Sequence, residues 1–287
     1  MFFAPTLLAL TRPELGNHVK ILCLSSGNAA GLGSIREKEL HKSALHLGLR
    51  DESDVFVVDD PTNFPDSMTT DWSATSIASL LASAFAPTIS CESNATSTAS
   101  SPTTATHRKP HSNGNARSNN EDDTTPPTAT IDVLLTFDPS GISNHPNHRS
   151  LHHGARAFLS SLMKGKSGYA CPVTLYTLTT TNIVRKYLGA LDAPVSMIVG
   201  IVQGLLYGKK EKDDTAVTSA SNDTSIRVQE SAPRQARRLL FISGIPEWLK
   251  AQQAMVAGHK SQMVWFRWGW ITIGRYMVVN DLKREVV

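Results

Sequence analysis

Two histidines three residues apart, His145 and His148, are the side chains of this sequence best suited to chemistry. They follow Asp138 across a short loop that contains Gly141. Histidine is the commonest neutral metal ligand and the usual acid–base group near pH 7. The pattern therefore indicates His148 as a metal ligand and His145 as a polarising acid–base. The alternative is a pair of surface histidines at the start of a helix.

Asp138 directly follows an apolar run, residues 131–137, that is typical of a buried strand. In α/β enzymes the reactive groups gather at the carboxyl end of a strand, beside a helix N-terminus. Asp138 at that position can orient an imidazole or bind a substrate hydroxyl. Capping its own loop is the alternative role.

The residues after this loop predict a helix from about 146 to 159. Pro146 fits the first helical position, which leaves His145 or Asn144 as the cap. His148 then lies in the first turn, and His152 lies one turn further on the same face. The helix therefore presents its histidines toward the end of the preceding strand.

The rest of the chain alternates in the same way between expected strands and helices. Such alternation implies a Rossmann-like parallel sheet with helices on both faces, in a single α/β domain over 1–287. The expected strands are 18–25, 54–58, 131–137 and 173–178, and the expected helices are 1–11, 34–47, 71–86 and 146–159.

A glycine-rich loop, residues 27–33, precedes the second helix but lacks the GxGxxG spacing of a dinucleotide site. Ser34 and Glu37 predict a capping box at the helix start, and Gly48 predicts its end. Arg36 in the first turn opposes the helix dipole. It indicates an anionic partner, with an ordinary surface arginine as the alternative.

Bulk composition excludes several classes of protein. The 287 residues carry a net charge of +3 and no basic stripe interleaved with aromatics, so nucleic acid is not an expected partner. The three cysteines are widely spaced, which argues against a disulfide framework. Residues 92–130 and 209–234 are rich in polar residues, and we expect both segments to be disordered insertions.

The C-terminal segment 260–283 has an unusual composition. It contains Trp265, Trp268 and Trp270, with Arg267 and Arg275 between and after them. Tryptophan with arginine at this density suits a helix at a membrane interface. The alternative is a core-packing helix whose two arginines snorkel to the surface.

Together these segments resemble the N-acetylglucosaminyl-phosphatidylinositol de-N-acetylases, within the LmbE-like zinc deacetylase superfamily. The resemblance spans nearly the whole chain apart from the two polar insertions. It includes Gly-Ile-Ser-Asn-His-Pro-Asn-His at 141–148 and the aromatic C-terminal segment, which is a mark of the glycolipid branch. The matching residues are 1–6, 22–28, 36–40, 64–66 with Trp72, 136–138, 141–148, 185–187, 265–267 and 275–277.

The resemblance implies hydrolysis of the acetamide on a glucosamine linked to phosphatidylinositol, a step in making glycosylphosphatidylinositol anchors. By family pattern His148 is a zinc ligand, His145 stabilises the tetrahedral oxyanion, and Arg36 lies near the substrate. Zinc in such a site lowers the pKa of its water and polarises the amide carbonyl. The resemblance also implies a glycolipid substrate, a membrane surface, and the cytoplasmic face of the endoplasmic reticulum.

The chain departs from the family pattern at its start. The family's His-Pro-Asp-Asp-Glu motif, with two zinc ligands and the general base, ends a first central strand that we expect to precede Met1. His148 is then one of three expected ligands, and we expect little activity from the printed residues alone. Two alternatives are a non-catalytic remnant that binds membrane or partners, and a soluble amino-sugar deacetylase.

Overall fold

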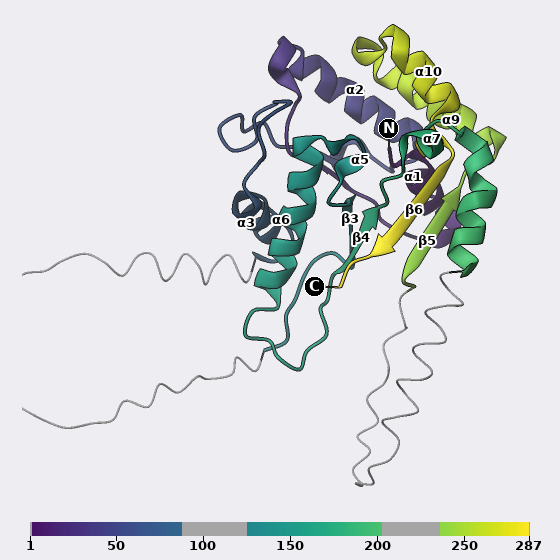
Figure 1. The fold of residues 1–287 in the computed structure, drawn as a ribbon. Helices are drawn as coiled ribbons and strands as arrows, with labels where there is room; N and C mark the ends of the chain where they lie inside the picture. Colours follow the sequence, from purple (N-terminus) through teal and green to yellow (C-terminus); the bar gives the residue numbers. More distant parts are fainter. Residues whose placement is uncertain (1, 88–124, 203–235, 287) are drawn as a thin grey trace, which may run out of the picture.

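The computed structural model describes residues 2–87, 125–202 and 236–286. Its strands form a four-stranded sheet in the order β3-β4-β6-β5 (Figure 1). A separate two-stranded sheet consists of β1 and β2. No described strand joins the two sheets. Their bounds are β1 Ile21–Cys23, β2 Val55–Val57, β3 Val133–Phe137, β4 Thr174–Leu178, β5 Arg238–Ile242 and β6 Val279–Arg284.

The expected parallel pairing is confirmed for β1 with β2 and for β3 with β4. The larger sheet is nevertheless mixed, because β6 runs antiparallel to both β4 and β5. β5 and β6 lie outside the expected alternation. Asn280 and Asp281 are unfavourable in a strand, and their burial here depends on distant partners such as the Thr6 hydroxyl, 2.8 Å from the Asn280 side chain.

Helices cover both faces of the four-stranded sheet (Figure 1). On one face α6 (Pro146–Leu162) packs against the strands, and α3 (Ala74–Phe85) packs on α6. On the other lie α1 (Ala4–Leu10) and α9 (Ile245–Gly258), with α2 (Gly33–His46) against α9. Side chains alternate accordingly along β4. Leu175 packs with α6, and Tyr176 packs with the aromatic residues before α1.

The start of α2 differs from the predicted capping box. The helix begins at Gly33, its cap residue is Leu32, and no side chain caps it. The Asn28 side chain instead accepts a hydrogen bond from Gly33 N at 2.9 Å, so a loop residue takes the place predicted for Ser34. The predicted end is confirmed, since Gly48 follows the helix with φ +96°.

The segment 260–283 is not one helix. It divides into α10 (Trp265–Ile273), a short 3-10 turn (Arg275–Met277) and the start of β6. Arg275 does not snorkel: it is fully buried and forms an ion pair with buried Asp192. The break follows from this burial, because Arg275 and the residues after it turn inward to join the sheet.

The predicted insertions 92–130 and 209–234 lie outside the described residues, apart from 125–130. In that short part, Thr130 N donates a hydrogen bond to Phe85 O at 2.8 Å, which connects the start of β3 to the end of α3. Among the helices of the described residues, none combines the length and the apolar character needed to cross a bilayer.

Candidate active site

Three of the predicted site residues, Asp138, His145 and His148, lie at the carboxyl end of β3, next to the end of β4 and the first turn of α6. A short helical turn, α5 (Gly141–Asn144), connects β3 to α6. Gly141 has φ +57°, and a β-carbon there would lie 2.9 Å from the β-carbon of His148. Only glycine lets this turn pack directly against the helix that bears the histidines.

Asp138 holds this connection in place. Its carboxylate accepts hydrogen bonds from Ser140 N at 3.1 Å and Gly141 N at 3.0 Å. It also accepts from Thr180 N and Thr180 Oγ1, both at 2.6 Å. These contacts support the alternative role of Asp138 as a cap of its own loop. They also connect that loop to Thr180 at the end of β4. Among the described residues, no hydrogen bond joins Asp138 to His145 or His148.

His148 is held as a neutral ring with one open nitrogen. It stacks on Phe137 at 3.9 Å between ring centroids, and burial lowers its pKa from 6.5 to about 4. Its Nδ1 lies 2.9 Å from Gly141 O, an acceptor, so Nδ1 carries the proton. Nε2 therefore keeps its lone pair, which is the form that binds a metal or accepts a proton.

His145 is held in the opposite tautomer. It is the N-cap of α6, as predicted, and its Nδ1 accepts a hydrogen bond from Asn147 N at 3.3 Å. In the neutral ring the proton then lies on Nε2, which makes that nitrogen a donor. The two rings are 5.0 Å apart. One histidine thus offers a donor and its neighbour an acceptor, which suits the activation of a carbonyl compound.

The described residues do not complete a catalytic metal site. A catalytic zinc site typically takes three protein ligands, but no cluster of three His, Cys, Asp or Glu side chains able to hold a metal occurs in the part of the chain that the structure describes. His148 supplies one open nitrogen. His152, also on α6, is buried with both ring nitrogens unpaired among the described residues.

Arg36 lies apart from the histidines. Its guanidinium donates to Gly27 O and lies 3.7 Å from the Asp66 carboxylate. Within the described residues, no hydrogen bond joins it to His145 or His148, while its Nε is buried without a partner. An unpaired buried donor costs free energy, so Arg36 keeps capacity to bind a ligand.

The end of β4 contributes residues that the motif analysis does not single out. Thr180 bonds to Asp138, as above, and Thr181 N donates to the Tyr276 hydroxyl at 3.1 Å. Tyr276 in turn donates to Thr179 O at 3.1 Å. Residues 275–277 are part of the family resemblance and include Tyr276, but the resemblance assigns no role to this tyrosine.

An apolar surface flanks the site. α7 (Ile183–Lys186) and the turn after it touch the end of α10, because a β-carbon at Gly189 would lie 3.2 Å from Ile273 O. Large apolar side chains are exposed on these segments and on residues 192–202, which are helical. We call them the apolar surface: Ile183, Val184, Leu191, Met197, Ile198, Ile201, Trp265, Phe266, Trp268 and Ile273.

Comparisons with known proteins agree with the resemblance. The profile of the GlcNAc-PI de-N-acetylase family matches residues 1–159, more than half of the chain. The chain is 52% identical to the N-acetylglucosaminyl-phosphatidylinositol de-N-acetylase of Arthroderma benhamiae, over 100% of this chain and 84% of that protein.

Two more distant relatives carry the same name. A probable N-acetylglucosaminyl-phosphatidylinositol de-N-acetylase of Schizosaccharomyces pombe is 31% identical, over 99% of this chain and 81% of that protein. The enzyme of Bos taurus is 28% identical, over 99% and 78% respectively. The chain belongs to the GlcNAc-PI de-N-acetylase family.

Proposed function

We propose that this protein hydrolyses the acetamide of N-acetylglucosaminyl-phosphatidylinositol, releasing acetate during glycosylphosphatidylinositol anchor biosynthesis. Its family membership and the names of its relatives support this reaction. The observation that carries the proposal is the histidine pair. His145 and His148 lie side by side at a strand end, one as a donor and one as an acceptor.

His145 and Asp138 act at the reacting end of the substrate. The Nε2–H of His145 donates to the oxygen that becomes negative when the acetamide carbonyl turns tetrahedral. Asp138 positions this donor, because its four hydrogen bonds hold the turn between β3 and α6. Arg36 binds substrate through the part of its guanidinium that remains exposed beside Asp66.

Zinc is the metal we propose, with His148 as one ligand through its open Nε2. Imidazole nitrogen is a common zinc ligand. The described residues do not supply the remaining ligands, so no catalytic step is assigned to the metal here. Metal analysis of the purified protein, before and after His148→Ala, measures this assignment directly.

We place the reaction at the cytoplasmic face of the endoplasmic reticulum membrane. The supporting observations are a lipid-linked substrate in the names of the relatives and the apolar surface beside the site. Fluorescence microscopy against a reticulum marker, followed by protease accessibility in sealed microsomes, tests both location and side. Protection of the protein from added protease contradicts a cytoplasmic orientation.

The decisive experiment incubates the purified protein with GlcNAc-PI in detergent micelles. Release of acetate, together with glucosaminyl-phosphatidylinositol detected by mass spectrometry, supports the proposal and overturns the expectation of little activity from residues 1–287 alone. The same protein must show a cooperative thermal transition, so that inactivity is not mistaken for misfolding. A folded, zinc-supplemented protein that leaves the acetamide intact contradicts the proposal.

One observation favours a second candidate, a non-catalytic protein that binds the glycolipid or membrane. Only one open histidine nitrogen at the strand end is suited to a metal, and no three-ligand cluster occurs in the described ranges. Binding to GlcNAc-PI vesicles without bound zinc or acetate release is the result that this candidate requires.

A further inference from the structure

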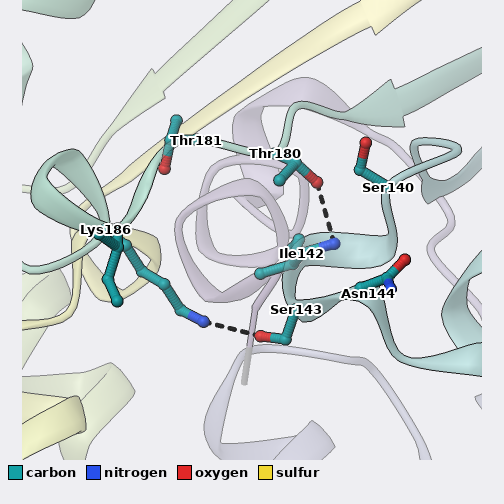
Figure 2. Close-up of a pocket in the computed structure, with 8 residues that line it drawn as sticks. Ser140, Ile142, Ser143, Asn144, Thr180, Thr181 and Lys186 are labelled. Carbon is teal, nitrogen blue, oxygen red and sulfur yellow. Dashed lines mark hydrogen bonds between the residues drawn. The ribbon is translucent and has the colours of Figure 1, made fainter.

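A pocket opens next to the turn that carries the histidines, and no role proposed above uses it. It has a volume of about 390 Å³ and lies between α5, the end of β4 and α7. Hydroxyl groups dominate its polar lining, with Ser140 and Ser143 on one side, Thr181 on another, and Lys186 opposite (Figure 2). None of the described residues that line it is acidic.

Lys186 is the cation of this pocket. Its Nζ donates to Ser143 Oγ at 2.7 Å, and the remaining two ammonium protons have no partner among the described residues (Figure 2). The side chain is half-buried, and burial lowers its pKa. No carboxylate forms an ion pair with it in the described ranges. A partly desolvated cation without a counter-charge favours an anionic ligand.

The backbone of α5 is held in a conformation that presents the Ser143 hydroxyl to Lys186. Ile142 has φ 53° and Asn144 has φ 56°, both in the left-handed region. Such backbone strain is concentrated at active sites and ligand-binding sites. Thr180 Oγ1, which accepts from Ile142 N at 2.9 Å, helps to maintain it. A branched residue in this region is unusual enough to indicate a binding role.

We propose that this pocket binds a phosphate group, with Lys186 as its counter-charge and the Ser143 hydroxyl as a donor. For the substrate this is the phosphodiester of the glycolipid, and that choice of lipid rests on the proposed function. A free phosphate monoester offers the same chemistry. Asn144, which lines the pocket, directly precedes His145 in the sequence, so the pocket adjoins the turn that leads into the histidine pair.

The surroundings fit a lipid phosphodiester. Ile183 lines the pocket, and Val184 and Leu191 are exposed close by in the chain. In phosphatidylinositol the diacylglycerol and the inositol lie on opposite sides of the phosphate. A phosphate at Lys186 therefore places the acyl chains along the apolar surface and the sugar toward His145.

Binding of soluble probes tests the pocket without reference to catalysis. Isothermal titration with inositol 1-phosphate and with inositol compares the charged and neutral headgroup. The wild-type protein is expected to bind the phosphate form more tightly. Lys186→Gln should weaken that binding about tenfold or more, since a hydrogen bond to a charged group contributes roughly 1.5–3 kcal/mol. Lys186→Arg keeps the charge and should retain most of it.

The control is Lys164→Gln, an exposed lysine beyond the far end of α6. It should leave inositol 1-phosphate binding unchanged. Equal affinity of wild type and Lys186→Gln overturns the proposal. So does a loss confined to Arg36→Gln, which would move the anion to the start of α2.

Vesicles separate the lipid from free phosphate. Flotation with phosphatidylcholine vesicles containing phosphatidylinositol should recover more wild-type protein than Lys186→Gln, while pure phosphatidylcholine vesicles should not distinguish them. Binding of free phosphate without this difference overturns the lipid assignment. If Lys186→Gln still releases acetate with an unchanged KM, the phosphate pocket is contradicted and the proposed function stands. If phosphate binds through Lys186 but no acetate is released, the pocket stands and the proposed function is contradicted.

Discussion

At the scale of single residues, two backbone groups give neighbouring histidines different chemistry. Gly141 O accepts from His148, and Asn147 N donates to His145. In both rings Nε2 faces away from these backbone groups. It is an acceptor in His148 and a donor in His145. The same helix start therefore supplies a base-like nitrogen and an oxyanion donor without any further side chain.

The variant His145→Asp keeps an N-cap at the start of α6 but removes the ring N–H donor. Aspartate is a favoured N-cap residue, so the thermal midpoint of unfolding should change little. The ring N–H is lost, so kcat for GlcNAc-PI deacetylation should fall about 10²–10³-fold with KM nearly unchanged. His153→Ala, an exposed histidine on the same helix, is the matched control. A similar fall in kcat for both variants would contradict the role of His145.

His259 makes stability depend on pH. Burial lowers its pKa from 6.5 to about 4, so it is neutral in the folded protein near pH 6. The unfolded chain takes up a proton below pH 6.5, and the folded chain does so only near pH 4. Stability is therefore complete above pH 6.5 and declines as the pH falls toward 4, by up to about 3 kcal/mol from this residue.

Urea unfolding at pH 7 and at pH 4.5 measures this contribution. His259→Gln should reduce the difference in unfolding free energy between the two pH values, while His153→Gln should not. A residual slope is expected in His259→Gln, because His148 carries a similar shift. An unchanged difference in His259→Gln would show that the ring is already charged in the folded protein.

At the scale of elements, a buried ion cluster attaches the segment after β4 to the C-terminal part of the chain. The Asp192 carboxylate accepts from Arg185 Nε at 2.6 Å and from Arg275, and Ser196 bonds to the same group at 2.7 Å. Asp192 and Arg275 are fully buried. Lys186 of the phosphate pocket, and the part of the apolar surface from Ile183 to Ile201, lie on the segment that this cluster holds.

Asp192→Ala should lower the free energy of unfolding by about 3–5 kcal/mol, because it leaves Arg275 as an uncompensated buried charge. Urea denaturation measures the change. The exposed pair Arg12–Glu247, at 3.4 Å, provides the control, and Glu247→Ala should cost less than about 1 kcal/mol. Comparable losses of unfolding free energy in Asp192→Ala and Glu247→Ala would contradict a larger contribution from the buried Asp192 cluster.

Local sequence signals were sufficient for much of the fold and part of the site. Pro146 after His145 determines where α6 begins, and the apolar runs locate β3 and β4, since these features act through neighbouring residues. Ser34 and Glu37 have the spacing of a capping box, yet Asn28 supplies the acceptor from the preceding loop. Caps of that kind depend on how a loop folds back.

The remaining elements depend on contacts between distant residues. Asn280 has no strand preference of its own, and its burial in β6 is stabilised by Thr6 at the other end of the chain. Arg275 is buried because Asp192 meets it, which hydropathy alone does not reveal. For the same reason the sequence around Lys186 does not reveal its role, because its partner Ser143 lies 43 positions away.

At the scale of the whole molecule, α5, α7 and α10 lie at one end of the four-stranded sheet (Figure 1). The two segments that form most of the apolar surface, 183–202 and 259–280, contain a single acidic residue, the buried Asp192. Lys186, Lys260 and Arg267 add positive charge. Aromatic residues with cations and without exposed acids suit the headgroup region of an anionic membrane.

Trp265→Ala tests whether this surface docks on lipid. Trp265 is 84% exposed, so removing it should leave the thermal midpoint nearly unchanged while lowering partition onto anionic vesicles about tenfold, equivalent to roughly 1.4 kcal/mol. Tyr169→Ala removes an exposed aromatic beyond the opposite end of α6 and should leave partition unchanged. Equal vesicle binding by wild type and Trp265→Ala would favour a soluble amino-sugar deacetylase, because the proposed reaction on a membrane glycolipid predicts that this surface contacts the bilayer.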